Sequence, residues 1–182
     1  GGAVVPVQKC GRCLNVPKMD LIFVSSGRHP ETEALIRKAT GSRFAHAALA
    51  IDIDGGRRIV EAVRPAIRFS ASNLFDDAAE LQTISIEISE EQRRAVAEKA
   101  LWLAGQPYGV DDCLIGGAND VLGTKAAQLL DRFINDDQSF NCSGLQTLLV
   151  REAFPGYMEE ANASTITPEA ARRYAMEYFK ET

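Results

Sequence analysis

Residue Ser89 divides this chain into a strand-rich first half and a helical second half. Four or five short runs of apolar and β-branched residues precede it, and turn-forming residues bound each run, which is typical of strands. These runs are residues 20–25, 45–53, 56–63, 66–70 and 81–88. We expect them to pair antiparallel, because no long crossover helix separates neighbours. Strands first and helices afterwards indicate an α+β fold in which an antiparallel sheet packs against helices.

Helix boundaries are well marked in this sequence. Ser89 and Gln92 match a capping box, and Thr167 followed by Pro168 is an N-cap with proline at the first helical position. Apolar spacing and terminators then set the extent of each predicted helix. The predicted helices are residues 31–39, 90–104, 125–133, 142–153 and a last one from 168 to near the end.

The length of 182 residues suits one domain with its own core. We expect an irregular arm, residues 1–19, followed by a single domain, residues 20–182. The net charge of −5 excludes nucleic acid as the expected partner, because phosphate binding requires a clustered basic surface. No run approaches the roughly 18 consecutive apolar residues of a membrane helix, so we expect no transmembrane segment.

Four cysteines, at positions 10, 13, 113 and 142, are too few for a disulfide-rich scaffold. Cys10 and Cys13 form a C-x-x-C without a second pair at metal-ligand spacing. We therefore expect no metal and no cofactor, and we interpret this pair as structural, for instance a local disulfide.

Cys142 differs from the other cysteines, because it follows a polar break and begins a predicted helix with an apolar stripe. A thiol in the first turn of a helix lies beside unsatisfied N–H groups and the positive end of the helix dipole. This placement stabilises the thiolate, which is the attacking species in nucleophilic catalysis. The alternative is a small buried hydrophobic residue on a helix face.

Residues 105–109 (GQPYG) and 141–145 (NCSGL) resemble the NlpC/P60 family of papain-like cysteine peptidases, in which a G-x-P-Y segment precedes a D-C-S-G-L nucleophile helix. In that family a G-D-L-[IV]-F strand and a strand led by the catalytic histidine follow the helix. Here the similar runs, residues 20–23 (DLIF) and 44–49 (FAHAAL), precede it. This order is similar to the circularly permuted branch of the superfamily, which includes YiiX-type amidases. The resemblance implies a permuted papain-like NlpC/P60 fold.

The resemblance also implies roles for three residues: Cys142 as nucleophile, His46 as base and Glu61 as the residue that orients the base. If residues 54–55 (DG) form a two-residue hairpin turn, Ala48 lies opposite Glu61. His46 is then the diagonal neighbour of Glu61 on the same face, about 7–8 Å away. A four-residue loop would instead turn Glu61 to the other face.

Each member of the His46–Glu61 pair has an alternative interpretation. His46 is expected to share its strand face with Ala48 and Ala50, whose small side chains leave room for a cleft; alternatively it is a structural histidine at a strand edge. Glu61 is alternatively a solvated strand residue. The only other histidine, His29, lies in a loop and is expected to be solvated.

The family tyrosine of the G-x-P-Y segment lines the site, so the resemblance implies that Tyr108 binds the oxyanion together with the backbone N–H of Cys142. This chain departs from the pattern in two ways. Residues 110–138 are an insert where the family has few residues, and we expect this insert to form a wall or lid over the cleft. In addition, Asn141 stands where aspartate is the commoner residue.

The resemblance implies a cysteine peptidase or amidase that cleaves amide bonds in peptidoglycan stem peptides. A compact enzyme of this kind suits an antibacterial effector that is exported or delivered to the bacterial periplasm, with an immunity or delivery protein as partner. Two alternatives stay open. One is an acyl-lipid or lipid-amide hydrolase or acyltransferase with the same catalytic residues, and the other is a non-catalytic binding module on the same fold.

Overall fold

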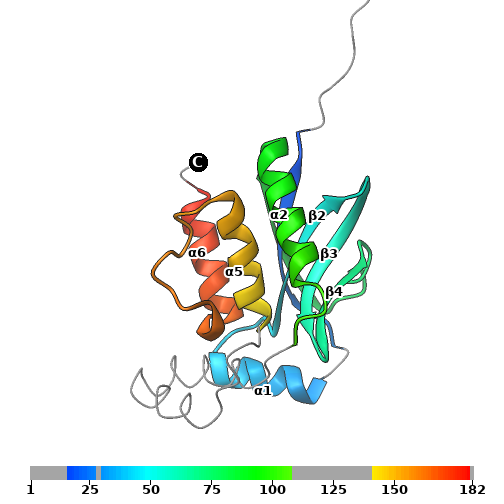
Figure 1. The fold of residues 1–182 in the computed structure, drawn as a ribbon. Helices are drawn as coiled ribbons and strands as arrows, with labels where there is room; N and C mark the ends of the chain where they lie inside the picture. Colours follow the sequence, from blue (N-terminus) through cyan, green and yellow to red (C-terminus); the bar gives the residue numbers. More distant parts are fainter. Residues whose placement is uncertain (1–15, 28–29, 108–140, 181–182) are drawn as a thin grey trace, which may run out of the picture.

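The structure is a computed structural model, and it describes residues 16–27, 30–107 and 141–180 (Figure 1). Within these residues, five strands form one antiparallel sheet in the order β4-β3-β2-β1-β5. The predicted α+β class and the antiparallel sheet are confirmed. The strands are β1 (Lys18–Ser25), β2 (His46–Ile53), β3 (Gly56–Val63), β4 (Ala66–Ala71) and β5 (Glu80–Glu87). The helices are α1 (Pro30–Thr40), α2 (Glu90–Leu103), α5 (Cys142–Ala153) and α6 (Pro168–Tyr178), with a 3-10 turn η1 (Ala163–Thr165).

The inner strand β1 lies between β2 and β5, and both of its faces are covered. Leu21 and Phe23 belong to the larger apolar layer, which includes helix residues. Ile22 and Val24 belong to a smaller layer on the opposite face. Burial on both faces explains why this strand reads as a continuous apolar run without polar alternation.

The main core lies between the sheet and a layer of helices. The helices α2, α5 and α6 gather on one side of the sheet, and α2 and α5 contact it directly (Figure 1). Val96, Ala100 and Leu103 of α2 are buried in this layer, together with Leu145 and Leu149 of α5. The sheet therefore presents one face to the helix that begins at the candidate nucleophile.

The helix caps lie where the sequence predicts them. Ser89 Oγ accepts a hydrogen bond from the Gln92 amide at 3.1 Å, and Gln92 Oε1 accepts one from the Ser89 amide at 2.8 Å. Thr167 caps α6 by accepting from the Ala170 amide at 3.2 Å. The predicted helices at residues 31–39, 90–104, 142–153 and from 168 are confirmed to within about one residue, whereas residues 125–133 lie outside the described part. Among the described helices, none combines the length and apolar character needed to cross a membrane.

The start of β1 differs from the prediction, since the strand begins at Lys18 rather than at residue 20. Met19 pairs with Ile86 of β5, and its side chain is fully buried in the main core. One residue earlier, the Pro17 carbonyl accepts a hydrogen bond from the Ile88 amide at 3.0 Å, just beyond the end of β5. Apolar burial therefore extends the strand into the segment predicted as an arm.

Candidate active site

The β2–β3 hairpin has the register that a two-residue turn predicts. Ile53 pairs with Gly56, which leaves residues 54–55 as the turn. Both turn residues have positive φ, 49° and 76°, as a type I′ turn requires. Continued along the strands, this register puts Ala48 opposite Glu61. The condition that places Glu61 on the same face as the candidate base is met.

The side chains of His46 and Glu61 meet across this hairpin. His46 Nε2 lies 3.1 Å from Glu61 Oε2, a hydrogen-bond distance. The Glu61 side chain is only 2% exposed and that of His46 18% exposed. The predicted proximity is therefore confirmed, and the alternative of a solvated Glu61 is wrong.

Two residues of β4 complete the surroundings of Glu61, and sequence analysis did not single them out. Arg68 pairs with Glu61 across the β3–β4 ladder, and its Nε donates to Glu61 Oε1 at 3.0 Å. Ser70 Oγ donates to the same oxygen at 2.7 Å. The available signal was the two-residue spacing of Arg68 and Ser70, which puts both side chains on one strand face.

Cys142 is the first residue of α5 and is buried, with 1% of its surface exposed. Asn141 caps this helix, because its Oδ1 accepts a hydrogen bond from the Gly144 amide at 2.5 Å. The Cys142 thiol lies close enough to His46 to raise the pKa of the imidazole. The structure thus brings the three predicted residues into one chain of contacts: Cys142, His46 and Glu61.

The charges of these side chains depend on one another. Burial lowers the pKa of His46, but hydrogen bonds to Cys142 and Glu61, together with their negative charge, raise it from 6.5 to about 9. Burial raises the pKa of Glu61, but the hydrogen bond and charge of His46, with donors from Ser70 and Arg68, lower it to about 2. At neutral pH these shifts favour a protonated His46 beside an ionised Glu61.

Gly144 of the C-S-G-L motif has a packing role. A Cβ built at this position would lie 2.2 Å from the Ala163 carbonyl oxygen and 2.9 Å from Asn141 Oδ1. Only glycine lets the backbone of η1 approach the first turn of α5 so closely. This part of the motif therefore positions the start of the nucleophile helix.

Gln146 ties the nucleophile helix to the strand of the candidate base. It lies one turn beyond Cys142, and its buried Nε2 donates to the Ala48 carbonyl at 2.6 Å and to that of Ile22 at 3.4 Å. Ala48 is two residues from His46 on β2. The Oε1 atom of Gln146 is buried, and no hydrogen bond to it is found in the described part of the chain.

The sheet face around His46 is filled, so the cleft predicted over Ala48 and Ala50 is wrong. Both alanines pack with Phe75, from the loop between β4 and β5, in the smaller apolar layer. The ring of Phe75 meets that of His46 edge-on, with centroids 6.0 Å apart. The small side chains make room for this aromatic ring.

Several predicted features lie outside the described residues, and their geometry is not discussed. They are the candidate oxyanion residue Tyr108, the alternative base His29, the insert at residues 110–138, and Cys10, Cys13 and Cys113.

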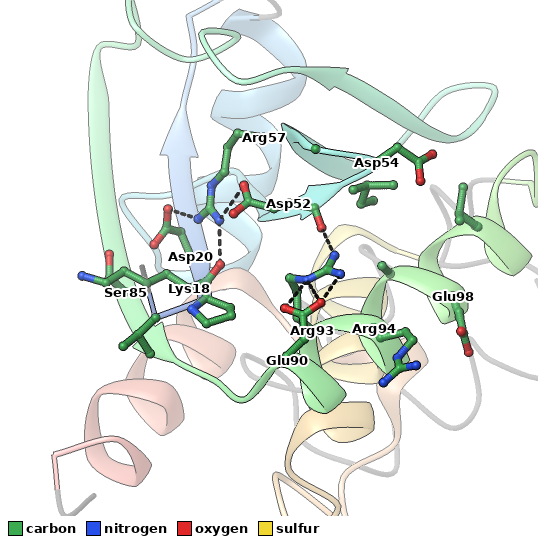
Figure 2. Close-up of a pocket in the computed structure, with 16 residues that line it drawn as sticks. Lys18, Asp20, Asp52, Asp54, Arg57, Ser85, Glu90, Arg93, Arg94 and Glu98 are labelled. Atoms are coloured by element: carbon green, nitrogen blue, oxygen red, sulfur yellow. Dashed lines mark hydrogen bonds and ion pairs between the residues drawn. The ribbon is translucent and has the colours of Figure 1, made fainter. Parts of the chain in front are cut away.

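A pocket of about 900 Å³ lies at the other end of β2 from His46, between the β2–β3 turn, the start of β1 and α2 (Figure 2). Two of its arginines, Arg57 and Arg93, are held by other residues of the pocket. Arg57 donates to Asp20 and to the Lys18 carbonyl, and Arg93 donates to Glu90 (Figure 2). Arg57 thus joins β3 to β1, and Arg93 joins α2 to β2, because its Nη1 also donates to the Asp52 carbonyl at 2.7 Å. No group of three or more potential metal-ligating side chains occurs within the described ranges.

Comparison with known proteins assigns no family. No protein-family model matches the chain, and no curated protein matches it significantly in sequence.

Proposed function

We propose that this protein is a cysteine hydrolase that cleaves amide bonds, with Cys142 as nucleophile, His46 as proton carrier and Glu61 as the residue that orients His46. The observation that carries the proposal is the position of His46, which is hydrogen-bonded to Glu61 and lies close enough to the Cys142 thiol for the thiol to raise its pKa. A nucleophile beside a base that a third group orients is the arrangement nucleophilic catalysis requires.

The reaction follows from the atoms that the site presents. Because Glu61 occupies Nε2 of His46, the proposed mechanism assigns Nδ1 to the exchange of protons at Cys142. The Cys142 thiolate attacks the amide carbon and forms a C–S bond, and the imidazolium gives its proton to the departing amine as the C–N bond breaks. His46 then takes a proton from water, and the hydroxide formed attacks the thioester. The acid departs, and the thiolate is restored.

The start of α5 supplies the other element of such a reaction. The N-cap leaves backbone N–H groups of the first helical turn pointing beyond the helix end, where the helix dipole is positive. In the proposed mechanism, the N–H of Cys142 donates to the oxyanion of the tetrahedral intermediate. Tyr108 remains the proposed second donor.

The chain order histidine, glutamate, cysteine supports a permuted papain-like NlpC/P60 enzyme as the type of hydrolase. On this basis the proposed substrate is the stem peptide of peptidoglycan, and the proposed setting is an antibacterial effector acting in the periplasm. The acyl-lipid and lipid-amide alternatives use the same three residues, so the substrate test has to separate them.

Thiol labelling tests the nucleophile directly. Iodoacetamide at mildly acidic pH should alkylate Cys142 before Cys10, Cys13 and Cys113, as read by peptide mass spectrometry, because in the proposed site the imidazolium of His46 stabilises the Cys142 thiolate. Since Cys142 is buried, a small reagent is required. Labelling should slow in His46→Ala and stay unchanged in the matched His29→Ala variant. Preferential labelling of another cysteine would exclude Cys142 as the nucleophile.

Turnover tests the reaction. Digested wall peptides and vesicles with acyl-lipid or lipid-amide substrates are incubated with the protein, and new amine ends or free fatty acids are measured. New amine ends that disappear in Cys142→Ala, and fall about 100-fold or more in His46→Ala, support the proposal. Fatty acid release instead favours the lipid alternative. Tight binding of wall peptides without turnover identifies a binding module.

A further inference from the structure

The two carboxylate oxygens of Glu61 have different partners. Oε2 faces His46 Nε2 at 3.1 Å. Oε1 accepts from Arg68 Nε at 3.0 Å and from Ser70 Oγ at 2.7 Å, and Arg68 Nη2 lies 3.0 Å from it. Rotation about the terminal bond of a glutamate is intrinsically broad, so a carboxylate held on one side only would turn freely. Here the donors on Oε1 set the plane in which Oε2 meets His46.

Sheet register explains why both donors reach the same oxygen. Arg68 lies directly opposite Glu61 in the β3–β4 ladder, and Ser70 lies opposite Ile59, two residues before Glu61. Directly opposite and diagonal neighbours share one face of a sheet and lie within side-chain reach. The three side chains therefore converge through the backbone pairing alone.

The strand that carries these donors is itself held in place, although it lies at the edge of the sheet. The Ile67 amide donates to the Gln106 carbonyl at 2.9 Å, and the Ile67 carbonyl accepts from the Gly105 amide at 2.9 Å. These bonds fix β4 to the end of α2, next to Arg68. The donors of Glu61 thus stand on a strand that is paired on both sides at this point.

A buried carboxylate also needs these donors in order to stay ionised. Glu61 is 2% exposed, and an unpaired ionised carboxylate is strongly disfavoured away from water. A protonated Glu61 would stabilise the imidazolium of His46 poorly. The Arg68 side chain is 54% exposed, so its guanidinium stays hydrated on one edge while the other edge donates to Glu61.

We propose that Arg68 and Ser70 are positioning residues of the site, which hold Glu61 so that His46 keeps its proton on Nε2 and turns Nδ1 toward Cys142. Neither residue touches the reacting atoms. The effect on turnover rests on the proposed function, whereas the effect on His46 does not.

The position of the proton on the His46 ring tests the proposal without any substrate. The chain has two histidines, so ¹⁵N spectra of histidine-labelled protein contain two rings, and His29→Gln assigns them. Above about pH 9, where His46 is neutral, its proton should reside on Nε2 in the parent. In Ser70→Ala and Arg68→Gln the proton should be shared between both nitrogens.

Kinetics give the second readout. Loss of a hydrogen bond to a charged group predicts that kcat, or the Cys142 alkylation rate, falls about 10–100-fold in Ser70→Ala and Arg68→Gln with KM unchanged. Ser70→Thr keeps the hydroxyl and should restore both readouts. The exposed residues Ser72 and Arg58 provide matched controls as Ser72→Ala and Arg58→Gln, which should behave like the parent.

The outcomes are separable. Parent-like ring nitrogens and parent-like rates in both Ser70→Ala and Arg68→Gln would overturn the proposal. If the ring signals change in these variants but the parent cleaves nothing, the positioning role stands and the proposed function fails. Should Arg68→Gln not fold, Ser70→Ala compared with Ser70→Thr still decides, because threonine keeps the hydroxyl that alanine lacks.

Discussion

At the residue scale, Glu61 is unusual for its burial. Among the described residues it is the one acidic or basic side chain in the buried class, where such residues are rare unless they are paired. Its partners are a histidine on one oxygen and two donors on the other. This complete pairing is what permits a charge inside the sheet layer, and it links the carboxylate to the thiol through His46.

Removal of this charge should change the titration of His46. In Glu61→Gln the pKa of His46 is expected to fall from about 9 toward its ordinary 6.5, because a carboxylate that stabilises the imidazolium is lost. NMR titration measures it, with His29 in the same sample as reference. A His46 that still titrates near pH 9 in this variant would contradict the interaction.

The pKa shifts of His46 and Glu61 also determine how the free energy of unfolding depends on pH. The raised pKa of His46 contributes stability that is fully present below 6.5 and is lost as pH rises through about 9. The lowered pKa of Glu61 contributes stability that is present above 4.5 and is lost as pH falls through about 2. The stability advantage of the parent over Glu61→Gln should therefore be greatest between about pH 4.5 and 6.5 and shrink on both sides, as denaturant unfolding at each pH measures.

At the element scale, α5 combines three local devices at its first turn. Asn141 supplies the cap, Cys142 occupies the first helical position, and Gly144 admits the backbone of η1. Gln146, one turn later, fixes the helix to β2 through the Ala48 carbonyl. The first turn of α5 is therefore held by its own cap and η1, and by β2 through Gln146. These contacts fix the thiol relative to His46.

Two helix caps provide a matched comparison. Asn141→Ala and Ser89→Ala each remove one N-cap side chain, so each should lower the free energy of unfolding by about 0.5–2 kcal/mol. Only Asn141→Ala should also slow alkylation of Cys142, because only α5 begins at the thiol. Equal alkylation rates in the two variants would mean that the cap does not position Cys142.

At the scale of the whole molecule, the sheet has two apolar layers of unequal size. The helices cover one face, and the loop between β4 and β5 covers part of the other through Phe75 and its neighbours Leu74 and Ala78. Phe75 also contacts the ring of His46. This loop therefore covers part of the second sheet face and packs against the ring of the candidate base.

The substitution Phe75→Ala tests this cover. It should lower the free energy of unfolding by about 3–5 kcal/mol, because a largely buried ring is removed from a filled layer. Leu81→Ala, at a side chain that is 51% exposed, is the control and should change stability by about 0.5 kcal/mol or less. Similar losses in the two variants, measured by denaturant unfolding, would show that the second layer contributes little.

Local sequence determined the elements and one half of the candidate site. Residues 54–55 specify a two-residue turn, and that turn sets a register with a period of two, so it alone decides that His46 and Glu61 share a face. The helix starts at Ser89 and Thr167 are also determined locally, because each capping side chain bonds to a backbone amide only three residues later.

Only the tertiary structure decided the rest, because it depends on how elements distant in the chain pack. The approach of Cys142 to His46 requires α5 to lie on the sheet at one particular place. Likewise, the small side chain of Ala48 is equally compatible with an open cleft and with an aromatic ring packed above it. Packing placed Phe75 there, and it converted a pattern that predicted a cleft into a filled layer beside the base.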